Sequence, residues 1–152
     1  MGYTHYWNTK KRTNESGYKK ALIEIRKVLE LKKDILAGSD GTGDPDYKTD
    51  IYINGKQDDS HETFFLPDTL KQIKKSDFCK TNRKPYDVVV VACLSILKEH
   101  LGKDLMLSSD GEAKEWEEGC NLASTVLQRP IRNPFEKQSI DFIKRSNSNA
   151  FI

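Results

Sequence analysis

Disulfide frameworks and membrane spans both lack their usual signals in this chain. Its three cysteines, Cys79, Cys93 and Cys120, are widely spaced and form no C-x-x-C pair, which predicts free thiols and a reducing compartment. The longest apolar run, Val88 to Leu94, is far shorter than the roughly 20 residues that a transmembrane helix needs. The first residues are polar and aromatic, so no signal peptide is predicted. We therefore expect a cytoplasmic protein with no membrane partner.

The chain also lacks an excess of charge of one sign. Its 25 basic and 23 acidic residues leave a formal net charge of +2, whereas proteins that coat nucleic acid carry a strong basic excess. The three histidines and the scattered cysteines have no zinc-ligand spacing, and the acidic residues of 40–50 do not follow the calcium-loop pattern. We expect no bulk nucleic acid partner, no metal and no cofactor.

What is present is the pattern of a single α+β domain. The length of 152 residues suits one core. The order β-α-β-β-β-α-β-α predicts an antiparallel or mixed sheet of about five strands, with three main helices on one face. We place this domain at 1–128, followed by a tail at 129–152 that is mobile or partly helical near 136–145. The expected elements are strands at 2–7, 50–54, 61–66, 77–81 and 104–108, and helices at 15–36, 85–101 and about 116–127.

One of these helices has a competing interpretation. Four consecutive valines, from Val88 to Val91, favour a strand on local propensity. We predict a helix because the apolar pattern continues to Leu101, which is too long for an ordinary strand. Pro85 suits the first turn of that helix.

The segment before this helix is the most informative for function. Three cations, Lys80, Arg83 and Lys84, lie with Thr81 just ahead of the predicted helix start. Free backbone N–H groups and the helix dipole favour an anion there, and Tyr86 is a candidate for stacking on a base. The alternative is a solvated turn in which Asp87 caps the helix. The segment lacks the glycines of a Walker phosphate loop.

Two histidine segments are further candidates. On a strand, Tyr3, His5 and Trp7 share one face, opposite Thr4 and Tyr6. This arrangement indicates either a ring-lined binding wall or a core strand with a hydrogen-bonded histidine.

The second histidine segment is at His61. His61 and Thr63 share a strand face, which lets an imidazole and a hydroxyl converge on one phosphate, although a plain surface strand explains them equally well.

Ser108–Gly111 follows a strand and precedes a helix, so Asp110 is either a ligand contact or part of ordinary helix capping. The glycine-rich loop 38–43 follows a helix and is interpreted as a linker.

These segments together resemble a family of small phage and prophage proteins. The matching stretches are MGYTHYW, GTGDP, INGKQDDSHETF, FCKTNRKPYD, and SSDG followed by Trp116. The resemblance implies a counter-defence protein that sequesters a nucleotide-derived immune signal, of the cyclic nucleotide or cyclic ADP-ribose type, and that forms a homo-oligomer. The implied ligand contacts are aromatic rings for adenine and Lys, Arg and backbone N–H groups for phosphate.

Three hypotheses follow. The first is a binding protein that uses Tyr3, Tyr6, Trp7, His61, Thr63, Lys80, Thr81, Arg83, Lys84, Tyr86 and Asp110. The second is a metal-independent phosphodiesterase in which His5 and His61 act as general base and acid. The third is a module that binds a host protein through the charged first helix and the tail.

Overall fold

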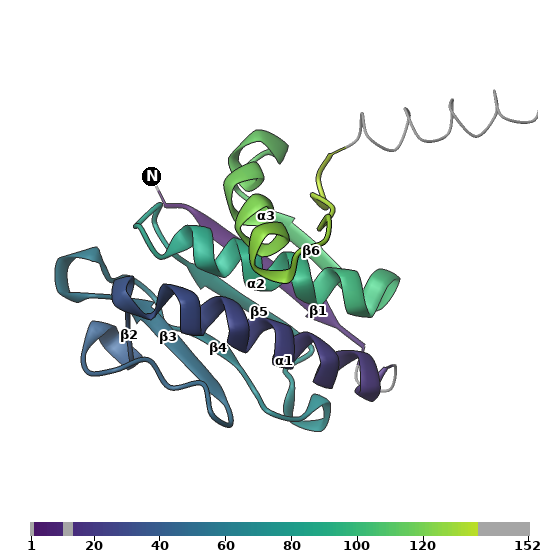
Figure 1. Cartoon of the computed structure of the whole chain (residues 1–152), viewed down its shortest axis with the longest axis horizontal. Helices are drawn as coiled ribbons and strands as arrows, with labels where there is room; N and C mark the ends of the chain where they lie inside the picture. The colour runs from purple at the N-terminus through teal and green to yellow at the C-terminus, as the bar shows by residue number, and fades with distance from the viewer. Residues whose placement is uncertain (1, 11–13, 137–152) are drawn as a thin grey trace, which may run out of the picture.

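Three helices lie over one face of two small antiparallel sheets in the computed structural model, which describes residues 2–10 and 14–136 (Figure 1). The strands are β1 Thr4–Thr9, β2 Leu36–Ala37, β3 Ile51–Gly55, β4 Phe64–Leu66, β5 Ser76–Lys80 and β6 Leu105–Ser109. The helices are α1 Glu15–Lys32, α2 Asp87–Leu101 and α3 Ala113–Leu127. Short 3-10 helices occur at Lys33–Ile35, Ser39–Gly41, Gln57–Asp59, Leu70–Gln72 and Gly102–Asp104. The predicted α+β class is confirmed.

Two details of the prediction differ from the structure. The expected helix at 15–36 ends at Lys32, and Leu36–Ala37 forms an unpredicted strand that pairs with Asn54 and Gly55. The expected strand at 61–66 is reduced to Phe64–Leu66, because the backbone before it is held by the Asn54 side chain. Six strands are therefore present in the described residues, against about five expected.

The sheet order places distant segments side by side. One sheet has the order β5-β1-β6 and the other β2-β3-β4, and all pairings are antiparallel. In the first sheet His5 lies between Cys79 and Ser109. Because β1 lies between β5 and β6, the turn that follows β5 and the loop that follows β6 both lie near the start of β1.

Helix α2 is the centre of the core. It packs against both α1 and α3, and every residue from Val89 to Leu97 is buried. An apolar helix covered on several sides needs no polar face, so tertiary burial accounts for the valine run and confirms the predicted helix. Within the described ranges, no helix has both the length and the apolar character to cross a membrane.

The packed fold continues past the expected boundary at residue 128. Ile131 is buried, and its N–H donates to Ser124 Oγ at 2.8 Å. The ring of Phe135 contacts Trp116 edge-on, with 4.8 Å between centroids. Residues up to 136 therefore belong to the domain, and the rest of the predicted helical stretch near 136–145 lies outside the described residues.

An ion-pair cluster anchors this extension. The Arg129 guanidinium binds both carboxylate oxygens of Glu24, at 2.5 and 2.7 Å, and also pairs with Glu99. His100 Nε2 lies 2.6 Å from Glu24 Oε1. Hydrogen bonds from Arg129, with a smaller contribution from His100, lower the pKa of Glu24 to about 2, against the opposing effect of burial.

We expect Arg129→Met to lower the free energy of unfolding by about 1 kcal/mol at pH 7, since solvent screens this partly exposed pair. A carboxyl with a depressed folded-state pKa stabilises above its ordinary pKa, and that contribution is lost as the pH falls toward 2. The deficit of the variant should therefore shrink between pH 5 and pH 2 in urea denaturation. The exposed Arg132→Met is the matched control, and an equal deficit at all pH values would contradict this account.

Candidate functional site

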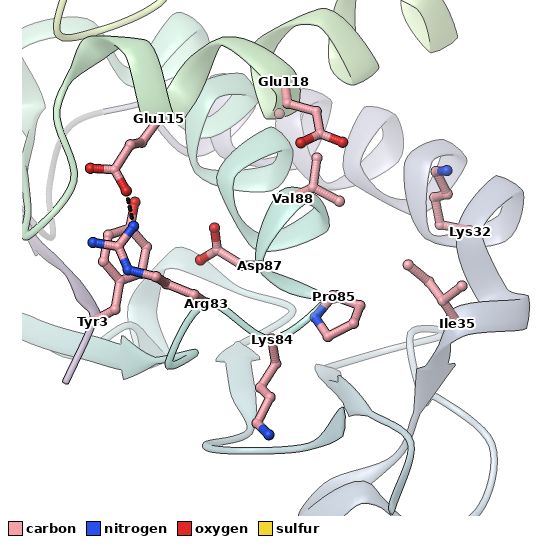
Figure 2. Close-up of a pocket in the computed structure, with 11 residues that line it drawn as sticks. Tyr3, Lys32, Ile35, Arg83, Lys84, Pro85, Asp87, Val88, Glu115 and Glu118 are labelled. Carbon is pink, nitrogen blue, oxygen red and sulfur yellow. Dashed lines mark hydrogen bonds and ion pairs between the residues drawn. The ribbon is translucent and has the colours of Figure 1, made fainter. Parts of the chain in front are cut away.

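A cavity of about 520 Å³ lies where the turn before α2 meets α1 and α3 (Figure 2). We call it the Arg83 cavity. It is polar at its rim, with three cations and three carboxylates among its residues. It is lined by Tyr3, Lys32, Ile35, Arg83, Lys84, Pro85, Asp87, Val88, Glu115, Glu118 and Gly119.

The turn between β5 and α2 positions the cations. Asn82 and Arg83 both have left-handed backbone conformations, with φ of 54° and 61°, which non-glycine residues adopt at a cost. The turn is held to the first strand by Asn82 N–H, which donates to Tyr3 O at 3.1 Å. The Arg83 guanidinium lies 4.1 Å from the centroid of the Tyr3 ring and pairs with Glu115 (Figure 2). Cation–π contact and ion pairing together fix the direction of Arg83.

A buried polar chain runs beneath the cavity. His5 is 0% exposed; its Nδ1 lies 2.8 Å from Ser109 Oγ and its Nε2 lies 2.7 Å from Asp87 Oδ1. Ser109 Oγ also accepts N–H bonds from Gly111, at 2.9 Å, and from Trp116 Nε1, at 3.2 Å. The serine proton is then donated to His5 Nδ1, and Nε2–H is donated to Asp87.

This chain resembles a Ser–His–carboxylate series, but it is not arranged for nucleophilic attack. Both lone pairs of Ser109 Oγ already accept bonds, and Ser109 does not line the cavity. Thr81 is buried and donates its hydroxyl to the same Asp87 oxygen, at 2.5 Å. The chain therefore orients Asp87 toward the cavity.

The charges at the cavity are balanced. Burial raises the pKa of Tyr3 to about 12, with smaller contributions from the charges of Asp87 and Glu115, so the phenol stays protonated at neutral pH. The ammonium groups of Lys32 and Lys84 have no ion-pair or hydrogen-bond partner in residues 2–10 and 14–136. They are available to an added anion.

The structure brings only some of the predicted residues to this cavity. Tyr3, Arg83 and Lys84 line it. Trp7 and Tyr86 are core residues instead, 1% and 0% exposed, and the Tyr86 hydroxyl donates to Glu62 O at 2.5 Å. Their rings are needed to fill the core, so they present no face to a ligand here.

The other predicted residues lie elsewhere. Tyr6 is on the sheet face away from the helices, paired with Phe78 across the strands, and Lys80 pairs with Thr4 in the same register. Asp110 accepts the Thr4 N–H at 3.0 Å and so ties its loop to β1. None of these three predicted residues lines the Arg83 cavity.

The two histidines do not line a common cavity. His61 is exposed, and its backbone N–H and C=O both bond to the Asn54 side chain, at 2.9 Å each. Thr63 Oγ1 accepts from Asn54 and from the backbone N–H of Asp40. His5 is instead enclosed beneath the Arg83 cavity, and neither histidine lines it.

Sequence reasoning missed several residues of the site. The sequence assigns Asp87 a role at the helix start and places Ser109 in a segment that is either a ligand contact or a helix cap, yet no side chain caps α3. Strand alternation and the β1–β6 register link His5 to Ser109, so a pairing prediction would have found that contact. Glu115 and Glu118 come from a helix about 30 positions away, and no local signal indicates them.

One group of side chains has ligand atoms close enough for a metal ion. Glu24, Glu99 and His100 each offer one within 4.8 Å of the others. Arg129 already binds both of the carboxylates, so the group is an ion-pair cluster.

Comparisons with protein-family models, curated proteins and solved structures gave no match to this chain. Its function is therefore inferred from the cavity and the groups that line it.

Proposed function

We propose that this protein binds and sequesters a nucleotide-derived immune signal in the Arg83 cavity, as a counter-defence protein of phage type. The observation that carries the proposal is the arrangement of Arg83 over the Tyr3 ring, beside Lys84 and Lys32, whose ammonium groups have no partner among the described residues. A volume of about 520 Å³ falls in the range of small-molecule sites, about 300–1,000 Å³.

An anion can enter this site at low cost. Arg83 is 61% exposed, and so its pair with Glu115 is a surface ion pair, which contributes about 0–1 kcal/mol to stability. A phosphate that replaces the Glu115 carboxylate gains a bidentate guanidinium contact. Lys84 adds a point charge from the same turn, and Lys32 adds another from the end of α1.

The groups at the cavity favour retention of the ligand over its cleavage. No histidine or cysteine lines it among the described residues, and the Tyr3 phenol stays protonated at neutral pH. The phosphodiesterase hypothesis needs His5 and His61 at one phosphate, and His5 has no exposed surface from which to act.

Calorimetry with cyclic dinucleotides, ADP-ribose and cyclic ADP-ribose isomers tests this proposal. We expect at least one to bind, and Arg83→Ala to weaken that binding about tenfold or more, since one charge-assisted hydrogen bond contributes about 1.5–3 kcal/mol. Arg132→Ala, which removes an exposed arginine away from the cavity, is the matched control.

The same experiment separates binding from catalysis. Heating the complex should release the ligand chemically intact, as judged by chromatography. Release of a hydrolysed product would indicate an enzyme, and failure of every ligand to bind would remove the proposal. A homo-oligomer is also proposed, and light scattering of the purified protein measures it.

A second candidate, binding of a host protein, has one observation in its favour. Ile23 and Leu31 on α1 are 56% and 61% exposed, and with Val126 they line a mostly apolar groove of about 1,000 Å³. Exposed apolar patches of this kind often mark interaction sites. A host partner that is retained by Arg83→Ala and lost with Ile23→Glu would favour this function over sequestration.

A further inference from the structure

We infer that the Arg83 cavity selects nucleotides that carry a free ribose 2′,3′-diol beside their phosphate, with the diol held by the Asp87 carboxylate. ADP-ribose-type signals meet this requirement, whereas 3′,5′-linked cyclic dinucleotides do not, because their 3′ oxygens are esterified. The inference rests on the proposed function and narrows its ligand class.

The two oxygens of Asp87 have different roles. Oδ1 accepts from His5 Nε2 at 2.7 Å and from the Thr81 hydroxyl at 2.5 Å. Oδ2 has no hydrogen-bond partner in the part of the chain that the structure describes, and the Asp87 side chain, 17% exposed, lines the cavity. One oxygen is thus fixed by buried groups, while the other is presented to a ligand in the cavity.

The support beneath Asp87 is rigid. His5 is enclosed between the rings of Tyr3 and Trp116, both edge-on at 5.1 Å between centroids. Its other nitrogen is held by Ser109. An acceptor held in place by buried groups loses little conformational freedom on binding, so its hydrogen bonds add directly to affinity.

The charge pattern decides which ligand group meets Asp87. A phosphate placed against a carboxylate is repelled, and Glu118 extends this negative side of the cavity. A carboxylate accepts well from hydroxyls, and acidic side chains bind the ribose hydroxyl in dinucleotide sites of other folds. The phosphate is then directed to Arg83 and Lys84 in the turn, four and three positions before Asp87 in the sequence. Because Asp87 needs a hydrogen-bond donor from the ligand, this separation of a cationic and an acidic side also disfavours bare polyphosphates, which offer no donor.

Calorimetry with three ligands provides the test: ADP-ribose, 2′,2″-dideoxy-ADP-ribose, which lacks one hydroxyl of each of its two ribose diols, and 3′,5′-linked cyclic di-AMP. We expect wild type to bind ADP-ribose at least tenfold more tightly than either of the other two. Asp87→Asn keeps an amide oxygen for His5 and Thr81 and replaces only the free acceptor. This variant should lose at least tenfold in affinity for ADP-ribose and no longer discriminate against the 2′,2″-dideoxy ligand.

The control is Glu117→Gln, which removes an exposed charge from α3 outside the cavity lining and should keep the preference for the diol. Equal binding of ADP-ribose and its 2′,2″-dideoxy form by wild type would overturn the inference even if Asp87→Asn folds poorly. Arg83-dependent binding of cyclic di-AMP alone would overturn it and leave the proposed function standing. No binding of any ligand would remove both.

Discussion

Replacing His5 by alanine is expected to lower the free energy of unfolding by about 3–4 kcal/mol. The imidazole is fully buried and bonds at both nitrogens, to Ser109 and to Asp87. Its removal leaves a carboxylate oxygen without one of its donors and opens a void between the rings of Tyr3 and Trp116. Leaving buried polar groups unpaired costs about 1–3 kcal/mol each, and the void adds to that cost.

The natural control for this change is His61→Ala. His61 is exposed, and the hydrogen bonds it makes use its backbone, so its removal should alter the unfolding free energy by no more than about 0.5 kcal/mol. Urea denaturation of both variants at pH 7 gives the comparison. Similar losses for the two histidines would show that the enclosed position of His5 is not the source of its effect.

Replacing Asn54 by aspartate is expected to cost about 3 kcal/mol at pH 7. The Asn54 side chain is fully buried; its Oδ1 accepts the N–H groups of Gly55 and His61, at 2.8 and 2.9 Å. Its Nδ2 donates to His61 O at 2.9 Å and to Thr63 Oγ1 at 3.2 Å. A carboxylate of the same shape places a negative oxygen against the His61 carbonyl and loses both donated bonds.

The pH dependence identifies this cause. Burial and the facing carbonyl raise the folded-state pKa of the introduced carboxyl above its ordinary value of about 4. The folded protein then binds a proton more readily than the unfolded chain, so the deficit is largest at neutral pH and shrinks as the pH falls toward 4.5. Asn121→Asp, at an exposed position of α3, should show no such deficit. A loss that is constant with pH would contradict the explanation.

The helices and the face alternation of β1 were predictable from the sequence because they depend on local periodicity. The spacing of apolar residues identified α1, and the length of the apolar pattern identified α2 despite its valines. Alternation placed Tyr3, His5 and Trp7 on one face. It could not show which face the helices cover, since Tyr6 makes the opposite face aromatic as well.

The site was only partly predictable, for reasons of distance along the chain. The turn carrying Arg83 and Lys84 was identified from its charges and its position before a helix. Whether His5 and His61 lie at one site cannot be predicted from either segment alone, and in the structure they do not. His61 is oriented by Asn54, seven positions earlier, while His5 is enclosed by α2 and α3. The carboxylates of α3 depend on how that helix packs, which local patterns do not encode.

The position of β1 at the centre of its sheet has a consequence for how the chain folds during synthesis. Strand β1 is bonded on both edges, and its His5 contacts lie 82 and 104 residues further along the chain. Closing loops of that length is entropically costly, and non-local pairings slow folding. Strand β1 can pair with β5 first, but its second edge stays open until β6 has been made. The cavity, which needs β1, α2 and α3 together, is completed among the last parts of the molecule.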